Sequence, residues 1–201
     1  MDLLIATTNA GKLAEIAAAL KELPVRILSL KDFPAAPEVV EDGATFEENA
    51  VKKARALAAF SGLPALADDS GLEVDALGGA PGIYSARYSG DDADDARNNR
   101  KLLDQLAGLP EERRGARFVC VLALSAPQGE WLFRAECPGR IAFAPRGANG
   151  FGYDPLFLHA SLGRTFGELD RETKSRVSHR GLALQKLKAA LPTLPVFAQR
   201  P

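Results

Sequence analysis

The chain of 201 residues is poor in the residue types that build redox, zinc and methionine-rich sites. It contains two cysteines, two histidines, one methionine and one tryptophan. Cys120 and Cys137 are too far apart to form a Cys-x-x-Cys pair, so neither a disulfide framework nor a zinc site is expected. Cys120 lies in an apolar strand pattern, which favours a small buried thiol. Gly-x-Ser-x-Gly and His-Glu-x-x-His do not occur either, which removes the main signatures of serine hydrolases and zinc proteases.

The sequence also lacks an excess of one charge and any long apolar run. Lys and Arg number 25 against 26 Asp and Glu, which excludes a basic body that binds nucleic acid through bulk charge. The longest apolar runs, such as residues 118–124, are far shorter than the ~20 residues of a membrane span. The N-terminus shows no pattern of a secretory signal. These features predict a soluble cytoplasmic protein without nucleic-acid or membrane partners.

The patterns that are present predict an α/β fold. Helical spacing follows Gly11 and occurs again at 45–62, at 91–106 and around Leu184, Leu187 and Leu191. Strands are expected at residues 3–7, 25–30, 64–67, 72–74, 118–125 and 131–136. Polar residues 68–71 are expected to form a turn, and residues 78–90 and 146–154 glycine-rich loops. Strands that alternate with helices, plus one hairpin, predict a mixed central sheet with helices on both faces.

Phosphate chemistry is suggested by the segment that joins the first strand to the first helix. Thr7, Asn9 and Lys12 supply a hydroxyl, an amide and an amine there, and a helix N-terminus offers free N–H groups to an anion. The segment is no Walker loop, because Ala6 and Leu13 replace the glycine and the Mg²⁺-binding hydroxyl residue. A solvated lysine is the alternative interpretation.

Acidic residues suggest a metal. Glu41, Asp68 and Asp69 lie beside predicted elements, and Mg²⁺ takes one or two carboxylates with phosphates and water. Any single acid could be a solvated residue or a helix cap, but Asp68 and Asp69 would repel each other unless a cation or hydrogen-bond donors compensated them. Residues 174–180 form a third group, which mixes donors for phosphate or base with His179, although a lone histidine is more often packed or capping.

Five segments taken together resemble the inosine triphosphate pyrophosphatase family, in the same order and over nearly the whole chain. They are Thr7-Thr8-Asn9-Ala10-Gly11-Lys12, Ala67-Asp68-Asp69-Ser70-Gly71-Leu72, residues 77–88, Phe151-Gly152-Tyr153-Asp154-Pro155 and Ser178-His179-Arg180. One departure is Thr8, where most members carry glycine. The resemblance implies Mg²⁺-dependent hydrolysis of ITP, dITP or XTP to the monophosphate and pyrophosphate. It also implies a homodimer in which residues 1–201 form a single domain of two lobes with a cleft between them.

The resemblance also implies roles for single residues. Glu41 and Asp69 would hold Mg²⁺, Asp69 would orient or deprotonate the attacking water with Asp68 as the alternative base, and Lys12 would complete the catalytic set. Lys12, Lys53 and Lys174 would surround the triphosphate. Phe151 and Tyr153 would flank the base, while Asp154, His179 and Arg180 would read its edge. The full set of expected substrate-binding residues is Thr7, Thr8, Asn9, Ala10, Gly11, Lys12, Lys53, Ser70, Arg87, Phe151, Gly152, Tyr153, Asp154, Lys174, Ser178, His179 and Arg180.

Two alternative functions remain open. A pyrimidine-directed nucleotide pyrophosphatase of the septum-formation-inhibitor type shares the general architecture. A nucleotide-binding regulator would keep the pocket without turnover, although Glu41 and Asp69 argue against it. Products released from a panel of nucleotides would distinguish the three.

Overall fold

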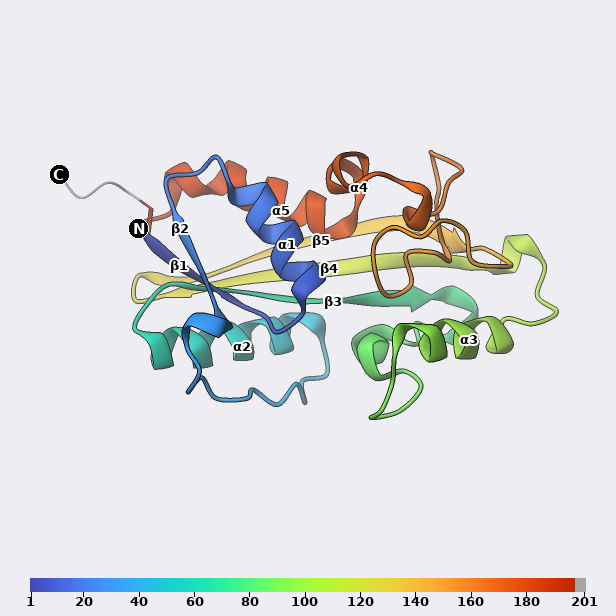
Figure 1. Cartoon of the computed structure of the whole chain (residues 1–201), viewed down its shortest axis with the longest axis horizontal. Coiled ribbons are helices and arrows are strands. Elements are labelled where there is room, and N and C mark those ends of the chain that lie inside the picture. The colour runs from blue at the N-terminus through green and yellow to red at the C-terminus, as the bar shows by residue number, and fades with distance from the viewer. Residues whose placement is uncertain (198–201) are drawn as a thin grey trace. The chain divides into compact units, whose positions relative to one another are not determined.

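The computed structural model describes residues 1–197; residues 198–201, the end of the predicted domain, lie outside it. Its centre is a six-stranded sheet in the order β2-β1-β3-β4-β5-β6 (Figure 1). β1 is parallel to β2 and β3, and β6 is antiparallel to β5, so the predicted α/β class with a mixed sheet is confirmed. The strands are β1 Asp2–Ala6, β2 Arg26–Ser29, β3 Ala65–Val74, β4 Gly115–Ala126, β5 Gly129–Ile141 and β6 Phe157–His159. The α-helices are α1 Ala10–Leu20, α2 Phe46–Ser61, α3 Asp95–Gln105, α4 Arg171–Val177 and α5 His179–Ala190.

The chain divides into two compact units. Unit 1 comprises Met1–Asp69, Cys120–Ala135 and Arg180–Pro201, and unit 2 comprises Ser70–Val119 and Glu136–His179. The boundaries fall inside β3, β4 and β5, so each of these strands contributes to both units. The cleft that the resemblance implies stays a prediction.

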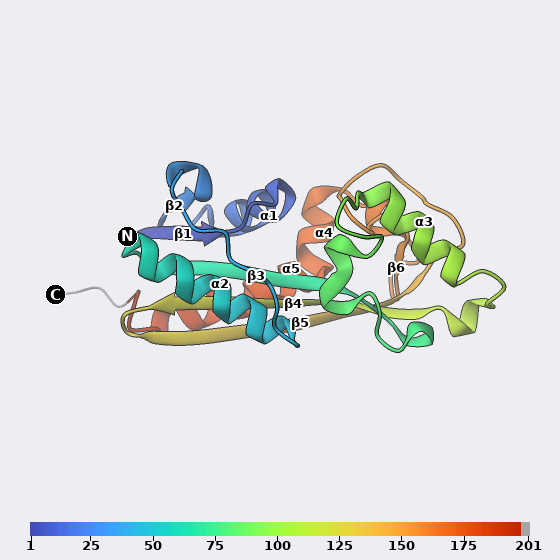
Figure 2. The ribbon, with the colours of Figure 1, turned by 90° about the horizontal axis from the view of Figure 1, so that it is seen from below.

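Unit 1 has helices on both faces of its strands. α1 and α5 lie over one face and α2 over the other (Figures 1 and 2). Ile16 of α1 and Leu184 of α5 pack with Leu66 and Leu122 in one buried cluster. β1 is buried on both faces because it has helices above and below it.

Unit 2 has a separate core that is rich in aromatic side chains. The ring of Phe118 lies 4.6 Å from that of Phe157 and 5.9 Å from that of Phe166, measured between centroids. Leu102 of α3 belongs to the same cluster. Such ring pairs contribute to stability beyond the area that they bury.

The structure corrects the expected turn at residues 68–71. β3 runs without interruption through these residues, and its first five residues are all buried. The sequence suggested a turn because Asp, Ser and Gly are typical of turns. Instead, cationic side chains from other elements compensate Asp68 and Asp69, so the strand can continue through them.

Other boundaries also differ from the predictions. α3 begins at Asp95 rather than at residue 91, because the side chain of Asp94 caps it by accepting a hydrogen bond from the Arg97 N–H. The last predicted helix is two helices, α4 and α5, with Ser178 between them. The loop at 78–90 contains a short 3₁₀ helix, Gly82–Arg87, and β6 was not predicted.

Thr45 and Glu48, which have the spacing of a capping box, lie at the start of α2. Thr45 is the N-cap and its hydroxyl accepts a hydrogen bond from the Glu48 N–H at 3.1 Å. The Glu48 carboxylate reaches back to the N–H of Ala44 rather than to that of Thr45. The helix ends at Gly62, in the left-handed conformation that favours glycine.

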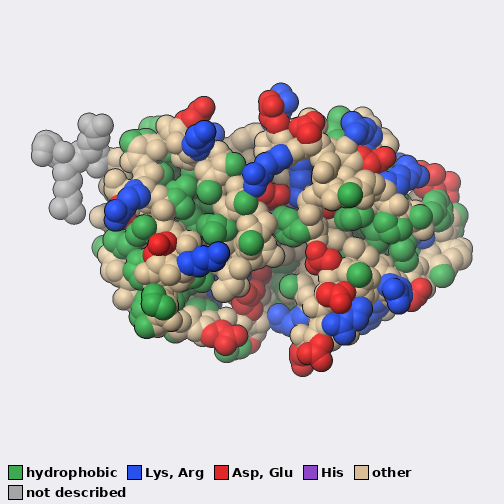
Figure 3. Space-filling model, in the orientation of Figure 1, with side chains coloured by type: hydrophobic (Ala, Val, Ile, Leu, Met, Phe, Trp, Pro, Cys, Tyr) green, Lys and Arg blue, Asp and Glu red, His purple; other side chains and the backbone are tan. Residues whose placement is uncertain are grey.

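The surface agrees with the balanced charge of the sequence. On the face shown in Figure 3, acidic and basic side chains are interspersed rather than gathered into one field. Within residues 1–197, no helix has the length and apolar character that crossing a membrane requires.

Candidate active site

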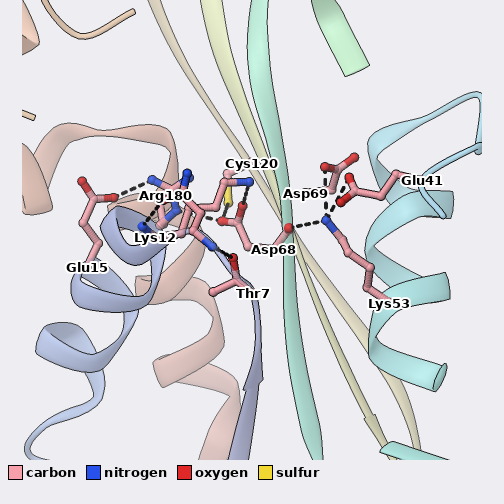
Figure 4. A network of polar contacts seen from close by, with 10 residues as sticks. Thr7, Lys12, Glu15, Glu41, Lys53, Asp68, Asp69, Cys120 and Arg180 are labelled. Carbon is pink, nitrogen blue, oxygen red and sulfur yellow. Dashed lines mark hydrogen bonds and ion pairs between the residues drawn. The ribbon is translucent and has the colours of Figure 1, made fainter. Parts of the chain in front are cut away.

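The candidate active site in unit 1 is built on two consecutive aspartates of β3. Successive side chains of a strand point to opposite faces, and Asp68 and Asp69 follow this rule (Figure 4). Asp68 points toward α1 and α5, whereas Asp69 points toward α2. The continuous strand therefore separates two carboxylates that would repel each other in a turn.

Both oxygens of the Asp68 carboxylate are engaged by other side chains. Lys12 Nζ lies 2.7 Å from Oδ1, and Arg180 Nε donates to Oδ2 at 2.8 Å. The Cys120 thiol, fully buried as predicted, donates to Oδ2 at 3.3 Å. Arg180 also pairs with Glu15 of α1, so Asp68 belongs to a buried network with compensated charge.

The charges of this network set the pKa of Asp68. Burial by itself raises the pKa of this carboxyl, but the charges and hydrogen bonds of Arg180 and Lys12 outweigh it and hold the pKa well below its ordinary value. Arg180 shows the reverse balance: burial lowers its pKa, while the charges of Asp68 and Glu15 raise it above the ordinary value. Both groups are therefore ionised near neutral pH.

The turn before α1 has the predicted strand–turn–helix form. Asn9 is the N-cap, and its side-chain oxygen accepts a hydrogen bond from the Lys12 N–H at 2.9 Å. The Thr7 hydroxyl accepts from the Asn9 N–H at 3.2 Å. Thr8 and Ala10 are exposed at this helix start, where the first amides have no partner within the helix. These groups and Lys12 can bind an anion.

Lys53 of α2 connects the other carboxylates. Its Nζ lies 3.1 Å from Glu41 Oε2 and 3.4 Å from Asp69 Oδ1, and it donates to the Asp68 carbonyl oxygen at 2.8 Å. Among residues 1–197, Oδ2 of Asp69 is buried without a hydrogen-bond partner. Burial raises the pKa of Asp69 to about 6, and the Glu41 carboxylate raises it as well, while the charges of Lys53 and Lys12 and the Asn49 side chain lower it. On this face, two carboxylates therefore share the ammonium group of Lys53.

The loop that carries Glu41 is held against the start of α2. The N–H of Gly43 donates to the side-chain oxygen of the fully buried Asn49 at 2.8 Å. A Cβ at Gly43 would lie 2.7 Å from that oxygen and 2.8 Å from Cβ of Glu48. The close approach requires glycine at position 43 because there is no room for a side chain, and it fixes the loop two residues from Glu41.

The oxygens beside Lys53 fit a hard divalent cation. Glu41 and Asp69 both approach the same ammonium group, and Asp69 keeps one buried oxygen unused. In the described part of the chain, no three His, Cys, Asp or Glu side chains are grouped to hold a metal. Mg²⁺ needs only one or two carboxylates when a phosphate supplies further oxygens, so this pair fits an ion that arrives with its substrate.

A second group of predicted residues lies in unit 2 around Asp154. The buried carboxylate of Asp154 accepts hydrogen bonds from Lys174 Nζ at 2.6 Å and from the Phe151 N–H at 2.9 Å. The Lys174 ammonium lies 4.8 Å from the centroid of the Phe151 ring and 5.8 Å from that of Phe166. The cation is thereby fixed over an aromatic ring that is partly exposed.

Other predicted residues also lie in unit 2. His179 stacks on Phe118 at 4.5 Å, and Tyr153, which is buried, donates its hydroxyl to the Ser85 carbonyl oxygen at 2.9 Å. Burial raises the pKa of the Tyr153 hydroxyl, which keeps it a donor. Arg87 lies over the ring of Tyr84. Ser178 is buried at the C-cap of α4, and Ser70 follows Asp69 in β3.

Two predicted residues have neighbours that the sequence did not indicate. Lys174, expected beside the triphosphate with Lys12 and Lys53, is paired with Asp154 beside Phe151. Arg180, expected to read the base, is paired with Asp68 and Glu15. Both are buried partners of carboxylates, and the sequence does not specify which carboxylate lies closest in space.

Several residues of these networks were not predicted. Glu15 lies one turn after Lys12 in α1 and pairs with Arg180. Asn49 is a polar residue on the buried face of α2, one turn before Lys53. Polar residues at positions that helical spacing assigns to the core were the signal that could have identified Asn49.

Comparison with known proteins agrees with this fold. A family model described as the Ham1 family matches residues 3–190. A dITP/XTP pyrophosphatase of Syntrophobacter fumaroxidans is 60% identical over 92% of this chain and 80% of its own length, and one of Geobacter sulfurreducens is 58% identical over 92% and 94%. A HAM1 protein of Coxiella burnetii superposes with a TM-score of 0.87 at 43% identity, over 96% of this chain and 99% of its own.

The mixed sheet with helices on both faces makes this chain an α/β protein, and the superposed HAM1 protein has the same fold. The chain belongs to the Ham1 family.

Proposed function

We propose that this protein hydrolyses the deaminated purine nucleoside triphosphates ITP, dITP and XTP to the monophosphate and pyrophosphate. The observation that carries the proposal is the pair of lysines, Lys12 and Lys53, that consecutive carboxylates hold on opposite faces of β3. The names of the relatives, dITP/XTP pyrophosphatases at 58–60% identity, support the substrate class.

The triphosphate would bind to the groups of unit 1. Lys12 and Lys53 carry fixed positive charge, and the start of α1 adds the amides of Ala10 and Gly11 together with Thr7, Thr8 and Asn9. Ser70, the first residue of unit 2, adds a hydroxyl next to Asp69 in β3. Phosphoanhydride hydrolysis requires mainly positioning and charge stabilisation, and the ion pairs with Asp68 and Asp69 hold Lys12 and Lys53 in place for this.

Glu41 and Asp69 are the residues that would hold Mg²⁺. When bound, the ion would acidify water and neutralise the charge that develops on the leaving pyrophosphate. The unused oxygen of Asp69 supports this assignment, because a buried carboxylate oxygen without a partner is costly unless a ligand satisfies it.

Of the two aspartates, Asp69 is the better candidate for the water-orienting residue. Both Asp68 oxygens are engaged by Lys12, Arg180 and Cys120, so Asp68 would position Lys12 instead. In the reaction, the water oxygen bonds to phosphorus, the bond from phosphorus to the bridging oxygen breaks, and the proton of the water passes to Asp69. The bridging oxygen leaves as part of pyrophosphate.

The residues of unit 2 would recognise the base. Phe151 and Tyr153 would flank it, and His179 and the Lys174 ammonium beside Phe151 would donate to its 6-oxo group. Adenine carries a donor at that position, and two opposed donors cost ~1–3 kcal/mol per unpaired group. The base site would be supported by four further residues of unit 2: Arg87, Gly152, Asp154 and Ser178. Arg180, which is paired with Asp68, would act on Asp68 and Lys12 rather than on the base.

A nucleotide panel tests the proposal. We expect ITP, dITP and XTP to yield the monophosphate and pyrophosphate at least ~10-fold faster than ATP, since one mismatched polar contact gives about this factor. A chelator should abolish turnover, and Mg²⁺ should restore it. Faster release of pyrophosphate from pyrimidine triphosphates than from ITP would favour the septum-formation-inhibitor type. Binding of ITP without release of any product would favour a nucleotide-binding regulator. Homodimerisation is proposed from the resemblance alone, and a cytoplasmic location is proposed as the default that the sequence predicts.

A further inference from the structure

α3 binds both polar groups of one peptide residue in the loop that carries Phe151 and Tyr153. The N–H of Gly152 donates to Asp95 Oδ2 at 2.7 Å, and Asn99 Nδ2 donates to the Gly152 carbonyl oxygen at 2.9 Å. Asp95 and Asn99 are four residues apart and therefore lie on the same side of the helix. The two side chains hold Gly152 from its N–H and from its C=O.

The backbone conformation of Gly152 explains why both groups face the helix. Its φ of +62° lies in the left-handed region, which side chains disfavour, while a Cβ there would meet nothing within 4 Å. Glycine is therefore needed for conformation and not for space. The reversal at Gly152 lets one helix face contact the N–H and the C=O of a single residue.

The neighbouring asparagine of α3 holds a second loop. Asn98 donates to the Ala86 carbonyl oxygen at 3.1 Å and accepts from the Ser89 N–H at 2.8 Å. The Tyr153 hydroxyl donates to the Ser85 carbonyl oxygen in that same segment. α3 thus supports the two aromatic positions of the proposed base site, Phe151 directly through Gly152 and Tyr153 also through the segment 85–89.

We propose that Asp95 and Asn99 are positioning residues for base recognition: they fix the Gly152 peptide and with it the rings of Phe151 and Tyr153. The inference rests on the proposed function, because it assigns the two rings to the base. The phosphate-binding groups of unit 1 do not depend on these contacts. Loss of either contact should therefore weaken binding of the base and leave phosphate binding intact.

The experiment compares Asp95→Ala and Asn99→Ala with Arg100→Ala, an exposed position of the same helix. The readouts are KM and kcat for ITP and the inhibition constants of IMP, which carries the base, and of pyrophosphate, which does not. Since one hydrogen bond is lost, we expect KM and the IMP constant to rise ~10-fold, with kcat and the pyrophosphate constant within about twofold of the parent. Asp95→Asn keeps an acceptor and should lie closer to the parent than Asp95→Ala.

Two results would overturn the inference. One is a KM for ITP that stays at the parent value in both alanine variants; the other is a pyrophosphate constant that rises by the same factor as that of IMP, which would indicate general loosening. If Asn99→Ala does not fold, the Asp95→Ala and Asp95→Asn pair decides. A parent protein that neither hydrolyses ITP nor binds IMP refutes the proposed function and the inference together. If the parent hydrolyses ITP and both Asp95→Ala and Asn99→Ala behave like Arg100→Ala, only the inference is refuted.

Discussion

The two faces of β3 carry neighbouring aspartates in opposite electrostatic situations. On one face, Asp68 meets Lys12, Arg180 and a thiol, and its pKa is held well below the ordinary value. On the other face, Asp69 shares a single lysine with Glu41, keeps an unpartnered oxygen and has a pKa raised to about 6.

The different environments of Asp68 and Asp69 correspond to two different roles of a buried carboxylate. A carboxylate with both oxygens paired to cations orients those cations and has few acceptor sites left for a ligand. A buried carboxylate oxygen without a hydrogen-bond partner raises the free energy of the folded protein, and a bound cation or water molecule can offset this cost. We therefore expect substitution of Asp68 itself to act mainly on stability and substitution of Asp69 mainly on activity.

The largest effect is expected from Asp69→Asn. The amide keeps the shape of the side chain but removes the charge and the proton acceptor, so kcat for ITP should fall by ~10³-fold or more. Asp42→Asn, at an exposed neighbour of Glu41, is the matched control and should keep parental activity. Initial rates of ITP hydrolysis, measured with Mg²⁺, test this prediction. A fall in kcat of less than tenfold would contradict the role of Asp69.

Asp68→Asn should mainly reduce stability. It leaves the buried Arg180 and the partly exposed Lys12 without the carboxylate that they share, and removing one partner of a buried ion pair costs ~3–5 kcal/mol. Urea denaturation of the variant beside the parent measures this free energy of unfolding. If Asp68→Asn unfolds at the same urea concentration as the parent, the charge network on this face does not stabilise the fold as we describe.

The smallest effect is expected from Gly43→Ala, which sharpens the comparison on the Asp69 face. The added methyl would overlap the Asn49 oxygen and Cβ of Glu48, and overpacking of this kind costs ~1–3 kcal/mol. Because the shift would move Glu41, turnover of ITP should fall by ~10-fold, in line with one displaced ligand. Ala44→Ser, at the exposed next position, should change neither the free energy of unfolding nor the turnover of ITP. Parental turnover in Gly43→Ala would show that Glu41 does not depend on this anchor.

Local signals in the sequence were sufficient for several elements. The capping threonine and Gly62 mark the two ends of α2 because such ends depend on side chains and conformations within a few residues. The run at residues 118–125 is apolar on both faces and lies in the central strand β4 for that reason. Candidate site residues were found as segments, since hydroxyl, amide, lysine and carboxylate groups are recognisable without coordinates.

The tertiary structure alone decided how those residues are paired. The sequence predicted a turn at residues 68–71 because Asp, Ser and Gly are typical of turns. The groups that compensate Asp68 and Asp69 come from distant elements, α1, α2 and α5. The resemblance implied that Lys174 lies beside the phosphates and Arg180 beside the base, and the structure adds that Lys174 pairs with Asp154 and Arg180 with Asp68. A sequence determines which groups are available and how each local segment folds, but ion pairing falls off steeply with distance. Only the packing of distant segments fixes which carboxylate each buried cation meets.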